Sequence, residues 1–184
     1  MSTLTTASQQ LDSLSLRLSA IVAWVPLIMA VLTVTVVLLR YGFGIGAIAA
    51  QEAVIYLHSA LFMLGASCTL LADEHVRVDV FYRNFGPRAR AWVNALGHVV
   101  FTLPLCALIG FASLGYVGES WAALEGSPEP GGIPAVYLLK TLIPAMACLL
   151  ALQALSEILR ALATLIGDPT DPETTGITAE TPHA

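Results

Sequence analysis

Charged residues are scarce in this chain. Only 11% of its 184 residues are Asp, Glu, Lys or Arg, against roughly 25% in a soluble domain. Hydrophobic residues make up 57%, and the mean hydropathy is +0.78. This composition excludes a water-soluble globular protein, because no aqueous fold of this size could hide so much apolar surface.

Cysteine is also rare, with three in the chain at positions 68, 106 and 148. All three lie within long apolar stretches, and none forms a Cys-x-x-Cys pair. The sequence therefore indicates neither a redox motif nor a disulfide framework. We expect all three to act as small hydrophobic residues in helix contacts.

Four long apolar runs dominate what is present, at about 18–39, 53–72, 91–116 and 135–155. Each reaches the roughly 20 residues that a helix needs to cross about 30 Å of hydrocarbon. The runs are continuous, whereas barrel strands are about 10 residues long and alternate apolar with polar positions. They predict an all-α integral membrane four-helix bundle over residues 18–160, with no room for a soluble catalytic domain.

The basic residues are distributed unequally between the two sides of this bundle. Six of the eight fall on one side if the spans alternate direction: Arg17, Arg77, Arg83, Arg88, Arg90 and Arg160. The third connection, 117–134, has no basic residue and contains three glutamates. By the positive-inside rule both termini are cytoplasmic and the acidic connection faces out.

The two ends of the chain differ from its centre. Leu11, Leu14 and Leu18 recur with helical spacing among polar residues, which predicts a short amphipathic helix at the inner surface, leading from the cytoplasmic segment 1–17 into the first span. Residues 161–184 become rich in Thr, Pro, Asp and Glu, with almost nothing to bury, and are predicted to be a disordered cytoplasmic tail.

Two histidines within the spans raise the question of a haem. His58 lies near the outer part of the second span and His98 near the inner part of the third. Their depths differ by roughly 12 Å, at 1.5 Å per residue, whereas two axial ligands of one haem lie at nearly the same level. Polar contacts between helices are the favoured interpretation, and no metal or cofactor is expected.

Three charged residues lie near the outer interface. Lys140 enters the fourth span about five residues from its outer end, where its stem can snorkel outward or pair with Glu119, Glu125 or a partner protein. Arg40 closes the first span and Glu52 opens the second, so they are candidates for a surface ion pair. Pro26, Pro104 and Pro144 can kink three spans, but none is accompanied by a buried carboxylate.

The chain resembles a known family in the order of its polar motifs. From about residue 21 to residue 160 it is similar to the small membrane subunit, of DctQ type, of the tripartite ATP-independent periplasmic (TRAP) transporters. The motifs that carry the resemblance are Arg40-Tyr41, Glu52, Leu64-Gly65-Ala66, His75-Val76-Arg77-Val78-Asp79, Ser120-Trp121, Glu125-x-Ser127, Gly132-x-Pro134, Lys140 and Leu150-x-x-Gln153. One departure is Ala49-Ala50-Gln51, where relatives often carry a tryptophan and an acidic pair.

This resemblance implies a role in transport. Such systems use a sodium gradient to import organic acids: a periplasmic protein captures the substrate, and a large membrane subunit carries it across by an elevator motion. The small subunit would act as a scaffold for the large one and as part of the docking surface for the binding protein. The implied docking residues lie in the outer loop: Glu119, Ser120, Trp121, Glu125, Ser127 and Glu129.

The remaining polar residues are expected to be structural. Arg40, Glu52 and Lys140 lie at the outer interface, and His75, Arg77 and Asp79 form a cytoplasmic motif. The chain is then neither an enzyme nor a nucleic-acid binder. Two other classes stay open: a membrane subunit of a redox complex, and an unrelated accessory or assembly protein. An absorbance spectrum and a mild detergent purification would discriminate them.

Overall fold

The computed structural model describes residues 2–72 and 85–167, and every regular element in these ranges is helical. The elements are α1 (Ser2–Val22), α2 (Val25–Gly42), α3 (Ile48–Leu71), α5 (Pro87–Gly97), the π-helical turn η1 (His98–Thr102), α6 (Leu103–Ala122) and α7 (Val136–Ile166). They make four helical stretches long and apolar enough to cross a membrane: 6–42, 48–71, 87–122 and 136–166. The predicted all-α fold with four membrane-spanning helices is confirmed.

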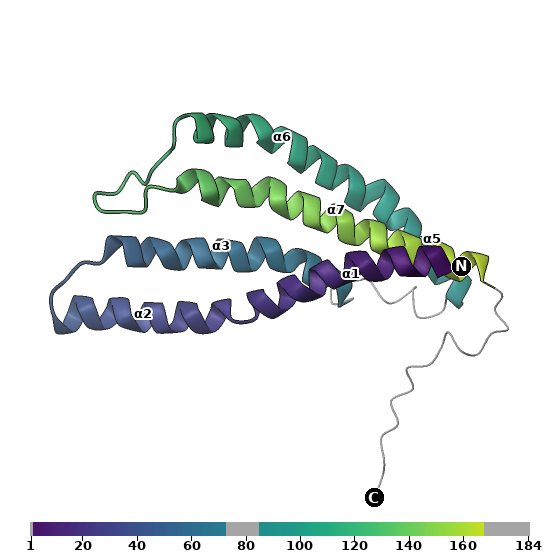
Figure 1. The fold of residues 1–184 in the computed structure, drawn as a ribbon, viewed down its shortest axis with the longest axis horizontal. Coiled ribbons are helices and arrows are strands. Elements are labelled where there is room, and N and C mark those ends of the chain that lie inside the picture. The colour runs from purple at the N-terminus through teal and green to yellow at the C-terminus, as the bar shows by residue number, and fades with distance from the viewer. Residues whose placement is uncertain (1, 73–84, 168–184) are drawn as a thin grey trace, which may run out of the picture.

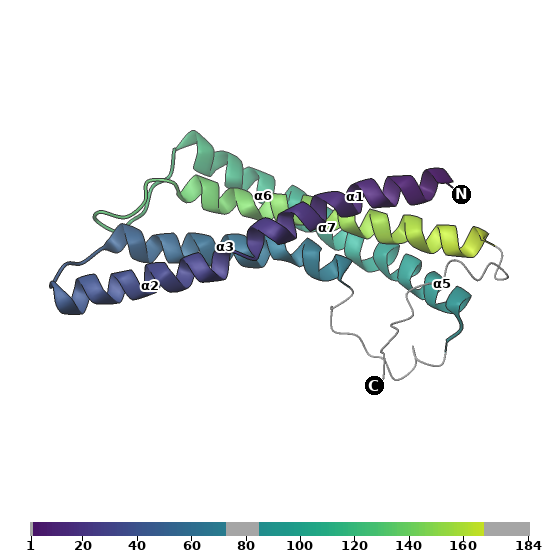
Figure 2. The same cartoon turned by 60° about the horizontal axis from the view of Figure 1, so that its bottom comes forward.

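The helices that cross the membrane lie in a layer, in the order α2, α3, α7, α6 (Figures 1 and 2). The α2–α3 and α6–α7 connections share one end of the layer, which we call the loop end. The N-terminus and the end of α7 share the other, which we call the terminal end. There α1 packs against both α7 and α3, and α5 packs against α7. The chain thus forms two hairpins, joined side by side through α3 and α7.

Of the three prolines predicted to kink spans, Pro26 and Pro104 lie at irregular points of the helices. α1 ends at Val22 and α2 begins at Val25, so the helix is interrupted just before Pro26. Proline lacks a backbone N–H, and its ring collides with the helical carbonyl four residues earlier. Pro104 follows the widened π-helical turn η1, an arrangement that reconciles a proline with a continuous helix. Pro144 lies inside α7, which runs on unbroken.

Small side chains fill the contacts between the helices. A methyl group added at Gly110 of α6 would lie 3.7 Å from Cβ of Ala147 on α7, and one at Gly65 of α3 would lie 3.9 Å from Val22 of α1. Such close approach suits membrane helices, whose association depends on packing rather than on hydrophobicity. A methyl at Gly97 or Gly115 would meet nothing within 4 Å, so these two glycines mediate no comparable contact among the described residues.

Several helices are longer than the apolar runs that predict them. α7 continues eleven residues past the predicted end at 155, and the third stretch covers 87–122 rather than 91–116. The extension of α7 packs through Ala161 and Leu165 on Ala91 and Ala95 of α5, which lie at the start of the third apolar run. Hydropathy predicts only the part of a helix that faces hydrocarbon. The apolar run therefore ends at 155, although α7 continues to Ile166 and packs on α5.

Candidate functional site

The connection between α6 and α7 is an ordered loop at the loop end. Its backbone closes on itself through Ser127 N to Ile133 O (3.1 Å) and Gly132 N to Glu129 O (3.0 Å). It also ties to the helix that follows, since Val136 N donates to Glu125 O at 2.9 Å. Gly131 has a φ of +83°, which glycine adopts without strain. This connection is therefore a built surface rather than a simple spacer.

Glu125 holds the start of this loop to both adjoining helices. Its Oε2 accepts hydrogen bonds from Ser120 Oγ of α6 at 2.6 Å and from Lys140 Nζ of α7 at 2.5 Å. The Lys140 ammonium also lies over the ring of Tyr116, 4.0 Å from its centroid, a favourable cation–π contact. Of the two interpretations of Lys140, the structure shows the ion pair, and Glu125 is its partner. The hydrogen bond from Lys140, followed by that from Ser120, lowers the pKa of Glu125 below its usual range.

Glu52 of α3 holds the middle of the same loop from the neighbouring hairpin. Its Oε1 accepts a hydrogen bond from Ser127 Oγ, and its Oε2 accepts one from Ile133 N at 2.6 Å. Gly132 leaves room for this contact because it has no side chain. An added methyl would lie 2.6 Å from Glu52 Oε1 and closer still to Ser127 Oγ. The carboxylate of Glu52 therefore binds the loop rather than Arg40, and Arg40 forms no ion pair with any described residue.

Of the other predicted docking residues, Glu119, Ser120 and Trp121 lie in the last turn of α6 and Glu129 lies in the loop. Glu119 and Glu129 are exposed. Trp121 keeps 44% of its surface exposed while its Nε1 donates to Thr141 Oγ1 at 2.8 Å and its ring packs edge-on against Tyr137, 4.7 Å between centroids. Ser120 is buried, and Glu125 and Ser127 are partly buried. The six residues thus divide into an exposed set and a set that holds the loop in shape.

A second polar cluster joins α1 to α7 at the terminal end, and sequence reasoning missed it. Three α1 residues at helical spacing face three α7 residues: Ser8, Asp12 and Ser15 against Gln153, Ser156 and Arg160. Asp12 is its centre. Its Oδ1 accepts from Gln153 Nε2 at 3.1 Å and from Ser156 Oγ at 2.7 Å, and its Oδ2 accepts from Arg160 Nη2 at 2.5 Å.

Burial shows that this cluster, which we call the α1–α7 seam, is interior except for Arg160, whose side chain is 46% exposed. Gln153 is 1% exposed, and Ser8 and Ser15 are buried. Ser15 Oγ donates to Gln153 Oε1 at 2.7 Å. Leu14, by contrast, is 41% exposed, so α1 turns its polar side toward α7 and leaves part of its leucine stripe open. The i, i+4, i+7 spacing of Ser8, Asp12 and Ser15 is the sequence signal that could have revealed the seam.

Other candidates from the sequence are distributed as follows. His75, Arg77 and Asp79 lie outside the described residues. His58 of α3 and His98 of η1 belong to separate elements, and His98 Nδ1 lies 3.2 Å from Thr102 Oγ1 in its own turn. Within 2–72 and 85–167, no three His, Cys, Asp or Glu side chains come together as a metal site would require.

Comparison with known proteins gives one match. The family model described as "Tripartite ATP-independent periplasmic transporters, DctQ component" matches residues 29–164. No curated protein and no solved structure matches the chain. The matched range takes in α3, α6 and the ordered loop, together with most of α2 and α7.

Proposed function

Because the chain belongs to the DctQ family and is therefore a small permease subunit of a TRAP transporter, we propose that it is the scaffold and part of the docking surface of an organic acid importer. Its partners are a large multi-span membrane subunit and a periplasmic substrate-binding protein. The transport is sodium-coupled symport, with the large subunit carrying the substrate by an elevator motion.

The clamped loop is the single observation that carries this proposal. Two carboxylates, Glu125 from within the loop and Glu52 from the neighbouring hairpin, fix the connection between α6 and α7. A docking surface benefits from such order, since a loop that is already fixed loses little conformational entropy when a partner binds. The loop is thus suited to a repeated, transient contact.

Docking residues have two roles in this proposal. Glu119, Trp121 and Glu129 are exposed and contact the binding protein. Ser120, Glu125 and Ser127 hold the surface in shape through their hydrogen bonds. Exposed carboxylates steer an oppositely charged partner and lose this effect as salt rises, because added ions screen them.

The scaffold role rests on the two polar clamps at opposite ends of the layer. Glu52 ties the two hairpins together at the loop end, and the α1–α7 seam ties the N-terminal helix to the last helix at the terminal end. A subunit held at both ends can serve as a fixed frame against which the moving part of the large subunit shifts. Arg40 and Lys140 complete the polar set at the outer interface.

The orientation follows from charge. We propose that the chain is a multi-pass protein of the bacterial inner membrane with both termini in the cytoplasm. The loop end then faces the periplasm, and the connection that carries His75, Arg77 and Asp79 faces the cytoplasm. Its support is the excess of arginine in and beside that connection. In this role the chain has no catalytic residues of its own.

Uptake by a reconstituted transporter tests the proposal. The large subunit and the binding protein are placed in liposomes with and without this chain, under an inward sodium gradient, and a panel of labelled carboxylates and sugar acids is offered. We expect sodium-dependent uptake of at least one substrate, only when the chain is present. Equal uptake without the chain would contradict the proposal, as would failure of the chain to stay with the large subunit through mild detergent purification.

A further inference from the structure

His58 is a polar side chain on an exposed face of a membrane-spanning helix. It lies ten residues after the start of α3 and thirteen before its end, so it is roughly 15 Å along a helix of about 36 Å. Its side chain is exposed, its one ring contact is to Phe62, and it has no hydrogen bond with any described residue. The other histidine of the spans, His98, pairs with Thr102 in its own turn.

This placement is unfavourable in a lipid environment. Acyl chains offer neither donors nor acceptors, so an imidazole facing them keeps its ring nitrogens unsatisfied. Ionisable and strongly polar residues in spans accordingly face protein or a water-filled cavity. The exposed face of α3 at His58 is therefore expected to be covered by protein in the assembled complex.

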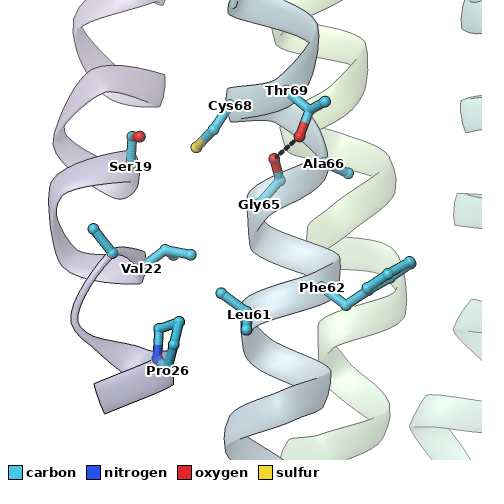
Figure 3. Close-up of a pocket in the computed structure, with 10 residues that line it drawn as sticks. Ser19, Val22, Pro26, Leu61, Phe62, Gly65, Ala66, Cys68 and Thr69 are labelled. Atoms are coloured by element: carbon cyan, nitrogen blue, oxygen red, sulfur yellow. Dashed lines mark hydrogen bonds between the residues drawn. The ribbon is translucent and has the colours of Figure 1, made fainter. Parts of the chain in front are cut away.

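The same face continues into a groove. Beyond His58 the exposed stripe of α3 passes Phe62, which is 76% exposed, and reaches a hollow of about 510 Å³ at the break between α1 and α2. Figure 3 shows Phe62, Ala66 and Thr69 on one side of α3, with Leu61 and Cys68 turned toward α1. Gly65 and Ala66 line the hollow, which exists because these residues carry little or no side chain. Thr69 Oγ1 donates a hydrogen bond to Gly65 O at 3.1 Å, so this hydroxyl has its partner within its own helix.

We propose that this stripe of α3, from His58 through Phe62 to the groove at Gly65 and Ala66, is the surface that receives one transmembrane helix of the large subunit. That helix presents a hydrogen-bonding side chain opposite His58. Two helical turns away, roughly 11 Å, it inserts an apolar side chain into the groove. The proposal rests on the proposed function, since it assigns the contact surface of that same partnership.

Site-specific photocrosslinking distinguishes the candidate occupants. Phe62 on α3 and Phe111 on α6 are matched probes, because they are 76% and 75% exposed and lie on different helices of the layer. Each is replaced in turn by a photoreactive phenylalanine, and the full complex is irradiated in membranes. We expect an adduct with the large subunit from position 62, in clearly greater yield than from position 111. An equal or smaller yield from position 62, or adducts there with lipid or with a second copy of this chain, would overturn the proposal.

Substitution of His58 provides a second readout that does not disturb the fold, since the side chain is exposed. His58→Leu is expected to raise the dissociation constant for the large subunit by about three-fold, the equivalent of one average interhelical hydrogen bond. His58→Gln keeps a neutral hydrogen-bonding group and should retain most of the affinity. An unchanged affinity in His58→Leu would contradict the proposal, whereas failure of the unaltered chain to bind the large subunit at all would contradict the proposed function instead.

Discussion

Glu52 Oε2 accepts a hydrogen bond from the backbone N–H of Ile133 at 2.6 Å, across 81 residues of sequence. This bond joins the first hairpin, through α3, to the loop that closes the second. The other oxygen of the Glu52 carboxylate, Oε1, accepts a hydrogen bond from the hydroxyl of Ser127. One side chain at the start of α3 thus sets the shape of a surface formed by another part of the chain.

Replacing Glu52 by Gln is expected to loosen that surface. The amide has one acceptor oxygen for two donors, so it keeps the bond from either Ser127 Oγ or Ile133 N and gives up the other, and neither bond then has an ionised acceptor. Losing a hydrogen bond to an ionised acceptor costs about 1.5 to 3 kcal/mol. We expect a lower melting temperature in detergent and a higher apparent KM for the binding protein at unchanged maximal uptake. The matched control is Glu119→Gln, an exposed position that should leave the melting temperature as it is.

Gly132 tests the same contact from the other side. A methyl at this position collides with Glu52 and Ser127, so Gly132→Ala should push the loop off the carboxylate and lower the melting temperature. Gly42→Ala is the control, because an added methyl there meets nothing within 4 Å and its backbone conformation suits alanine. Similar melting temperatures for the two variants would show that the loop is not clamped as described.

Glu125 predicts a dependence of stability on pH. Its pKa in the folded protein lies below its ordinary value of 4.5, chiefly because Lys140 hydrogen-bonds the carboxylate. The stabilisation is therefore fully present above pH 4.5 and is lost as the pH falls through the lower, folded-state pKa. The melting temperature of Glu125→Gln should fall less steeply with acid than that of the unaltered chain. Glu129→Gln, in the exposed part of the loop, is the control and should keep the full acid response.

The α1–α7 seam predicts a cost for removing its central carboxylate. Asp12→Ala removes the ionised acceptor of buried Gln153 and Ser156, whose donors keep only the bonds to Glu157 Oε1 at 3.5 Å and to Ser8 O at 3.1 Å, at a cost of about 1.5 to 3 kcal/mol. A loss of this size lowers the melting temperature of a chain this long by about 2 to 4 °C per kcal/mol. Ser13→Ala, one residue away on the exposed side of α1, should have no measurable effect. Equal melting temperatures for the two variants would argue against the seam.

The four spans could be predicted because apolar length alone determines whether a helix can cross a membrane. Their ends could not, since α7 continues to Ile166 through contacts that hydropathy does not record. The N-terminal helix was expected from Leu11, Leu14 and Leu18, yet its polar side is the one that binds α7. The α1 and α7 residues that meet there are up to 148 positions apart in the sequence.

The loop shows the same limit at a smaller scale. Glu125 was among three candidate partners of Lys140, and the sequence offered no means of choosing between them. The choice depends on the path of the backbone, including the positive φ of Leu124 and of Gly131. Proximity in the sequence favours Arg40 as the partner of Glu52. Its observed partners, Ser127 and Ile133, come from a distant loop.

We propose that the clamped loop faces the periplasm and that the arginine-bearing connection faces the cytoplasm. Labelling of single cysteines with a membrane-impermeant maleimide tests it most directly, in a chain whose three native cysteines are replaced by alanine. A cysteine at position 129 should react in intact spheroplasts, and one at position 88 only after the membrane is permeabilised. Labelling of position 88 in intact spheroplasts, with position 129 protected, would show the opposite orientation.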